Sequence, residues 1–97
     1  MKITLVSLLA LLLLLGGDAS AQPDAGEAAK IRYLIESVET LRGVTFLRNG
    51  GEHDARQAAE HLRLKLKRAG SRVQTAEEFI LLCASRSSIS GEPYCLR

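Results

Sequence analysis

Apolar residues recur every three or four positions between Glu27 and Leu41, which places them on one face of a helix. Asp24 and Glu27 have the spacing of a capping box at the start of this stretch, and Gly43 follows it as a stop signal. We therefore predict a first helix over Glu27–Leu41. Its inner face comprises Ala28, Ile31, Leu34, Ile35, Val38 and Leu41.

A second stretch with the same period runs over Asp54–Ala69. Asp54 is a suitable N-cap, and Gly70 is a suitable stop. Leu62–Arg68 also alternates between apolar and basic residues as a strand does, but the longer period and the absence of β-branched residues favour a helix. The predicted apolar stripe is Ala55, Ala58, Ala59, Leu62, Leu66 and Ala69.

The third predicted helix begins after Thr75, which forms a capping box with Glu78, and runs to about Arg86. Its inner face comprises Ala76, Phe79, Ile80 and Cys83. Leu81 and Leu82 fall outside that stripe. A helix that is apolar almost all round is buried on several sides or meets a partner.

Two short segments have strand character. Val44–Arg48 is β-branched and aromatic, and the turn sequence Asn49-Gly50-Gly51 follows it. Pro93–Leu96 is a second candidate strand, which we expect to pair with Val44–Leu47. The predicted fold is thus mainly α: a small three-helix domain over residues 22–97 with a minor two-stranded β ribbon.

The first residues have the organisation of an export signal. A positive start, Met1-Lys2, precedes the apolar run Ile3–Leu15, and Ala19-Ser20-Ala21 supplies the small residues that a signal peptidase requires. The apolar run is too short for a spanning helix, which needs about 20 residues. We predict a cleaved signal peptide over residues 1–21, cut between Ala21 and Gln22, and a periplasmic or secreted protein.

Length and composition restrict the function further. A chain of 97 residues is one domain at most. A domain of this size buries only about 60% of the surface that its unfolded chain exposes. A large enzyme with a deep, dry cavity is therefore excluded. Lys and Arg number 13 against 11 Asp and Glu, so the chain is only slightly basic.

The basic residues concentrate in one run: Arg63, Lys65, Lys67, Arg68 and Arg72. We select Arg63, Lys67 and Arg68 as candidate contacts for an anionic envelope lipid or lipopolysaccharide. The alternative is a solvated helix C-terminus, which cations favour. Nucleic acid is not an expected partner, because export separates the chain from it and no aromatic recognition module is present.

Exposed leucines supply the other candidate surface. Leu64, Leu81 and Leu82 are candidate contacts for a protein partner or a second copy of the chain, and membrane contact is expected to be peripheral at most.

Cys83 and Cys95 form an even pair in a chain predicted to be exported. Two interpretations stay open. One is an intramolecular disulfide, which would stabilise the fold by roughly 3 kcal/mol in the chain-entropy estimate for such a loop. The other is a buried apolar Cys83 and a free or intermolecular Cys95.

No motif predicts catalysis, a metal or a cofactor. His53 and His61 are eight residues apart, which is about 12 Å along a helix and too far for one ion. The serines between Ser85 and Ser90 lie outside any G-x-S-x-G or S-x-x-K motif, so loop capping is the favoured role and a small hydrolase is the third choice.

A series of short motifs resembles one known family. They are Phe46-Leu47-Arg48-Asn49-Gly50, His53, His61–Leu66, Thr75–Ile80, Ala84–Ser88 and Ser90–Tyr94. In this order they resemble the YfeK-like family of small exported bacterial proteins, over about Leu34–Leu96. The resemblance implies an export signal and a Gram-negative periplasmic setting, without an established activity or any catalytic residue to carry over.

Two departures from that family suggest uncovered apolar surface. Relatives continue into another helical segment after the Pro-Tyr strand, and they tend to be polar at the positions of Leu81 and Leu82. The sequence therefore predicts a non-catalytic periplasmic interaction or binding module, with a peripheral binder of anionic envelope components as the alternative.

Overall fold

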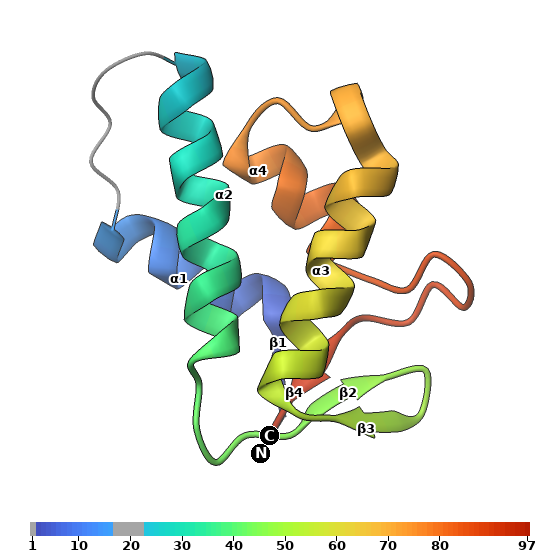
Figure 1. Cartoon of the computed structure of the whole chain (residues 1–97). Helices are drawn as coiled ribbons and strands as arrows, with labels where there is room; N and C mark the ends of the chain where they lie inside the picture. The colour runs from blue at the N-terminus through green and yellow to red at the C-terminus, as the bar shows by residue number, and fades with distance from the viewer. Residues whose placement is uncertain (1, 17–22) are drawn as a thin grey trace.

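The structure is a computed structural model that describes residues 2–16 and 23–97 (Figure 1). The described residues are mainly helical. The helical elements are α1 (Leu5–Gly16), α2 (Pro23–Glu39), α3 (Ala55–Ala69), the 3-10 turn η1 (Gly70–Arg72), α4 (Ala76–Phe79) and the π-helical turn η2 (Ile80–Ala84).

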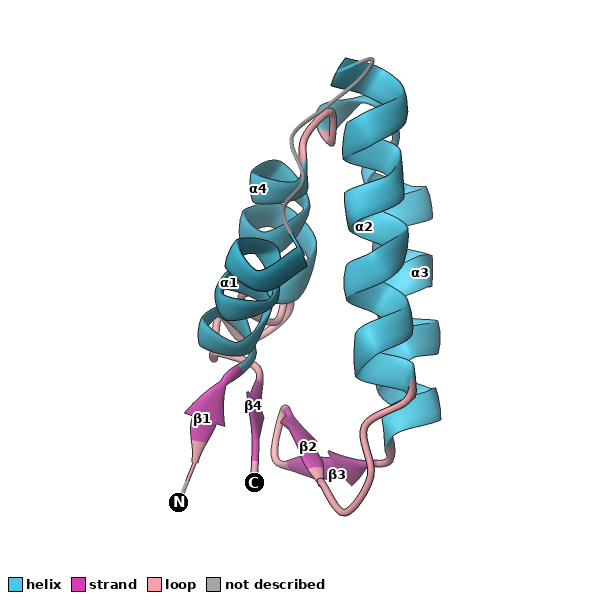
Figure 2. Ribbon diagram, turned by 90° about the vertical axis from the view of Figure 1, so that its left-hand side faces the viewer, coloured by secondary structure: helices cyan, strands magenta, loops and turns pink. Residues whose placement is uncertain are grey.

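Two helical layers stand on a small sheet. α2 and α3 form one layer, and α1 with α4 forms the other, while the strands lie together at one end (Figure 2). The core between the layers contains Leu34, Val38, Leu62 and Phe79, each fully buried. The apolar stripes predicted from the sequence therefore face one another.

α2 is longer at its start than the sequence suggests. It begins at Pro23 rather than Glu27, and it ends at Glu39 rather than Leu41. Glu27 lies inside the helix, so the predicted capping role is wrong. Its carboxylate instead accepts a hydrogen bond of 2.7 Å from the backbone N–H of Ala76, at the start of α4.

α3 confirms its predicted bounds. The Asp54 side chain accepts from the N–H of Gln57, whose own side chain accepts from the Asp54 N–H, so the two form a capping box. Gly70, with φ of 57°, follows the last turn. The alternating segment Leu62–Arg68 is helical, as the longer period predicted.

α4 confirms the capping box of Thr75 and Glu78. The helix continues as η2 and ends at Ala84, two residues before the predicted Arg86. Phe79, Ile80 and Cys83 are buried as predicted.

The sheet is larger than the predicted ribbon. It contains four antiparallel strands in the order β1-β4-β2-β3. They are β1 (Ile3–Thr4), β2 (Phe46–Arg48), β3 (Gly51–His53) and β4 (Cys95–Leu96). The predicted pairing of β2 with β4 is confirmed, with Phe46 opposite Leu96.

The prediction of two strands is wrong because β1 and β3 carry weak strand signals. Asn49 (φ 52°) and Gly50 (φ 77°) both have positive φ, the requirement of a type I′ hairpin turn. This turn folds the polar segment Gly51–His53 back onto β2. β1 lies in residues 1–21, the predicted signal peptide, which we call the leader and which the sequence placed outside the domain.

The leader is packed into the fold in this structure. β1 pairs with β4, and α1 lies against α2 and η2 with Leu5 and Leu9 buried. The described helices are therefore four, one more than the three predicted for residues 22–97. The predicted cleavage site, Ala21–Gln22, lies outside the described residues. No helix in the described ranges is long and apolar enough to cross a membrane.

Candidate functional site: a basic pocket beside helix α3

A hollow of about 390 Å³ lies between α3, the tip of the β2–β3 hairpin and the segment that follows η2. We call it the basic pocket. Its cations are Arg48, Lys65, Arg68 and Arg72. Its other lining residues are Asn49, His61, Ala69, Leu82, Ser87, Ser88, Ile89 and Tyr94. None of these lining residues is acidic.

The spacing of residues along α3 gathers one side of the pocket. His61, Lys65 and Arg68 are four and three residues apart, so they share one face of the helix. Arg72 follows in η1. Arg48 is the last residue of β2, and it reaches the pocket because the hairpin turn lies beside α3.

The positive charge of the pocket is not neutralised by ion pairs within the described residues. The four ion pairs found there use other cations, namely Lys30, Arg56, Arg63 and Arg97. The cations of the pocket therefore create a local excess of positive charge, although the whole chain carries a formal charge of only +2.

The wall of the pocket is a chain of three polar side chains. Nζ of Lys65 donates to the Tyr94 hydroxyl at 3.2 Å, and that hydroxyl lies 3.0 Å from Nε2 of His61. Because an ammonium only donates, the Tyr94 oxygen accepts from Lys65 and its proton is free for a neutral His61. Lys65 also donates to the Arg86 carbonyl at 3.0 Å, which leaves one N–H for a ligand.

His61 is held neutral in this position. Burial, together with the positive charges of Arg48 and Lys65, lowers the pKa of His61 from 6.5 to about 4. At neutral pH the imidazole therefore accepts the Tyr94 proton rather than adding a cation to the pocket.

The outer rim is the Ser87–Gly91 loop, which is built around a buried serine. The Ser87 hydroxyl accepts from the N–H groups of Ile89 and Ser90 at 3.1 and 3.2 Å. The Ser90 hydroxyl donates to Oδ1 of Asn49 at 2.6 Å, which ties the loop to the hairpin tip. Ser87 thus has the capping role predicted for the serines of this region.

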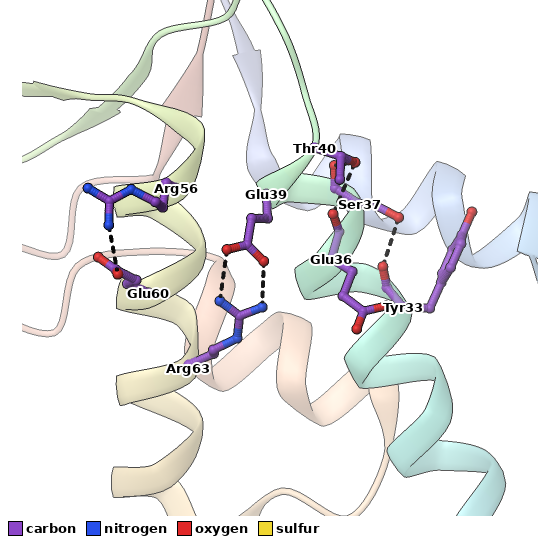
Figure 3. A network of polar contacts seen from close by, with 8 residues as sticks. All are labelled: Tyr33, Glu36, Ser37, Glu39, Thr40, Arg56, Glu60 and Arg63. Atoms are coloured by element: carbon purple, nitrogen blue, oxygen red, sulfur yellow. Dashed lines mark hydrogen bonds and ion pairs between the residues drawn. The ribbon is translucent and has the colours of Figure 1, made fainter.

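The three predicted anionic contacts are separated by the fold. Only Arg68 lines the pocket. Arg63 points to the other side of α3, where its guanidinium donates to both oxygens of Glu39 on α2, at 2.7 and 3.3 Å (Figure 3). Lys67 is exposed and lies outside the lining of the pocket.

The other cations of the basic pocket could be predicted from the sequence only in part. Lys65 and Arg72 belong to the basic run, but Arg48 is remote in sequence and its approach depends on the hairpin turn. The spacing of His61, Lys65 and Arg68 was a usable signal, because it defines one helix face.

The candidate partner leucines are exposed. Leu81 is 65% exposed, Leu82 is 47% exposed and lines the basic pocket, and Leu64 is 42% exposed on α3. Their location on the surface agrees with their position outside the predicted stripes.

Both cysteines are free thiols in the structure. Cys83 is buried, and this burial raises the pKa of its thiol. Cys95 lies in β4 opposite Thr4 and Leu47. The two interpretations of the pair, an intramolecular disulfide or a buried Cys83 with a free or intermolecular Cys95, both stay predictions.

The side chains that could bind a metal ion or act in a serine nucleophile pair do not lie together among the described residues. The described residues contain no group of three or more His, Cys, Asp or Glu side chains placed to hold a metal ion. Ser88 and His61 line the same pocket, but Nε2 of His61 faces the Tyr94 hydroxyl. A serine nucleophile needs a base within hydrogen-bond reach, and the described residues form no serine–histidine hydrogen bond.

Comparisons with known proteins assign the chain to a family. Residues 25–97 match the family of unknown function DUF5329, and the chain belongs to it. It is also 43% identical over 94 residues to the uncharacterised protein YfeK of Salmonella typhimurium, covering 97% of this chain and 77% of that relative. The predicted YfeK-like resemblance is thereby confirmed. No solved structure gives a significant match.

Proposed function

We propose that the protein is an exported, non-catalytic binding module that holds an anionic group of an envelope molecule in the basic pocket. The observation that carries the proposal is the convergence of Arg48, Lys65, Arg68 and Arg72 on one hollow whose lining contains no carboxylate. Guanidinium and ammonium groups bind phosphate and carboxylate oxygens through charge-assisted hydrogen bonds.

The pocket is also built to recognise rather than merely attract an anion. Lys65 is positioned by the Tyr94 hydroxyl and the Arg86 carbonyl, so less side-chain freedom is lost when a ligand binds. His61 is neutral and fixes the Tyr94 hydroxyl from the other side. Ser88 is exposed at the rim and offers a further donor.

The test is calorimetric titration of the full chain with glycerol 1-phosphate and with inorganic phosphate. Arg68→Glu is the pocket variant, and Lys67→Glu is the matched control, because it makes the same charge change one residue away and outside the lining. We expect at least a tenfold weaker Kd for Arg68→Glu and less than a threefold change for Lys67→Glu, with binding that weakens as salt is raised. Equal losses in the two variants, or no saturable binding by the unmodified chain, would refute the proposal.

A second candidate function is protein contact through the exposed leucines. Leu81 and Leu82 occupy consecutive positions on η2 and both are exposed, which is unusual for large apolar side chains on the surface of so small a domain. The candidate partner is a second copy of the chain or another envelope protein. Light scattering distinguishes this function from the first, because it depends on Leu81 and not on Arg68.

A further inference from the structure

We infer that the anion bound by the basic pocket is the phosphate of a membrane-lipid headgroup, and that the Ser87–Gly91 loop inserts Ile89 into the bilayer beside it. This inference rests on the proposed anion-binding function. It adds that the ligand belongs to a bilayer surface rather than to a soluble molecule.

The first observation is the exposure of Ile89. Its side chain is 91% exposed, the highest value among the exposed large apolar residues of the described chain. Ile89 lies in a loop that also lines the basic pocket. An isoleucine in this position contributes nothing to the core, whereas it is suited to an apolar phase outside the protein.

The second observation is that the loop holds Ile89 outward in a defined conformation. The Ile89 N–H donates to the Ser87 hydroxyl, and the Gly91 N–H donates to the Ser87 carbonyl at 2.9 Å. Gly91 has φ of 78°, a conformation in which glycine carries no steric penalty. Since these bonds close the turn internally, the exposed isoleucine is not a consequence of a loose loop.

The third observation is the arrangement of charge around the apolar side chains. Leu82 and Ile89 line the same hollow as Lys65, Arg68 and Arg72. At an anionic bilayer, apolar side chains enter the acyl region while lysine and arginine remain at the depth of the phosphates. A hollow lined by both cations and apolar side chains therefore suits a lipid phosphate together with the start of its acyl chains.

A soluble anion does not account for both features. The cations alone suffice to bind phosphate in solution, and the exposed isoleucine would then be an unused apolar side chain. At a membrane the two act together, because each basic residue at the surface strengthens binding by roughly fivefold, and full burial of one large aliphatic side chain strengthens it by about tenfold or more.

The experiment is flotation of the full chain with two kinds of vesicle. One contains phosphatidylglycerol and phosphatidylcholine, and the other is pure phosphatidylcholine. We expect binding to the anionic vesicles to be at least tenfold stronger and to weaken steeply between low and physiological salt. Any binding through the apolar leader is shared by all variants and is insensitive to the charge of the pocket.

Two variants separate the loop from the pocket. Ile89→Ser should weaken binding to the anionic vesicles by about tenfold or more while leaving the Kd for glycerol 1-phosphate unchanged. Tyr33→Ser is the control for loss of an exposed apolar side chain, because Tyr33 is exposed on α2 and lies outside the pocket lining, and it should leave vesicle binding unchanged. Circular dichroism establishes that both variants are folded.

Each of the following outcomes would overturn the inference. Vesicle binding that is equal for the two lipid compositions contradicts binding through the cations of the pocket. Binding that is equally weakened by Ile89→Ser and Tyr33→Ser contradicts insertion of the loop. Self-association that Ile89→Ser abolishes, without vesicle binding, assigns the loop to a protein contact. Glycerol 1-phosphate binding that persists while vesicle binding is absent overturns the membrane inference alone, whereas loss of both overturns the proposed function as well.

Discussion

The hydroxyl oxygen of Tyr94 lies 3.0 Å from Nε2 of His61, and the two rings meet edge to face with their centroids 5.7 Å apart. The two residues are 33 positions apart in the sequence: His61 lies within α3, and Tyr94 directly precedes β4. Their hydrogen bond connects α3 to the segment leading into β4, and it forms the boundary between the core and the basic pocket.

The stability of the fold should fall between pH 6.5 and pH 4 because of His61. Burial and the nearby positive charges lower the pKa of His61 to about 4, so the unfolded chain binds the proton first as the pH falls. The stability that the neutral imidazole contributes is therefore complete above pH 6.5 and is lost as the pH approaches 4. Urea unfolding at several pH values measures this loss.

The control for this prediction is His61→Gln, whose amide can still accept the Tyr94 proton but does not titrate. The stability of this variant should fall less over the same pH range than that of the unmodified chain. Carboxylates contribute equally to both proteins: Ala76 and Arg63 hold the pKa values of Glu27 and Glu39 below their usual range. Parallel pH profiles would show that His61 is not the titrating group.

Tyr94→Phe should lower the free energy of unfolding by about 1–3 kcal/mol, because two side-chain hydrogen bonds are lost while the buried ring is kept. It should also weaken binding of glycerol 1-phosphate, since Lys65 loses one of the two acceptors that position it. Tyr33→Phe is the matched control on an exposed ring. Equal effects of the two substitutions on stability would contradict the importance of the buried contact.

The sequence predicted those parts of the fold that depend on local chemistry. The N-cap at Asp54, the capping box at Thr75 and the stop at Gly70 each need only a few neighbouring residues, and all three are confirmed. The pairing of β2 with β4 was also accessible, because two short strand-like segments have few ways to pair in so small a domain.

The remaining features depend on contacts between distant segments. Glu27 was predicted to cap its own helix, but it accepts from Ala76, a residue 49 positions later. Arg63 has the sequence context of a free basic residue, yet Glu39 on α2 engages it. Arg48 enters the pocket only because Asn49 and Gly50 both take positive φ, and the composition of the turn does not reveal which side chains the hairpin will bring to α3.

The exposed leucine Leu81 should govern self-association, if the second candidate function is correct. Leu81→Lys should convert an oligomeric full chain to a monomer and should leave glycerol 1-phosphate binding within about twofold, because Leu81 does not line the basic pocket. Size-exclusion chromatography with light scattering measures the mass. Glu77→Lys on α4, a matched surface substitution, should not change the mass. A monomer both before and after Leu81→Lys would leave this surface without support as a contact between copies.

Leu9 and Leu11 lie two positions apart on α1 but differ in burial, so substitutions at these two positions test how α1 packs. Leu9 is fully buried and Leu11 is 52% exposed on the same helix, α1. In the full chain, Leu9→Ala should lower the free energy of unfolding by about 2–5 kcal/mol, since it leaves a cavity against the rest of the core, whereas Leu11→Ala should change it by less than about 0.5 kcal/mol. Chemical unfolding measures both values, and equal small effects would show that α1 does not pack as described.

If the leader is cut after Ala21, as its sequence predicts, the surface of α2 and η2 that contacts α1 becomes uncovered. A chain beginning at Gln22 should then bind more of an apolar fluorescent dye than the full chain does, and Leu9→Lys in the full chain should reproduce that increase by displacing α1.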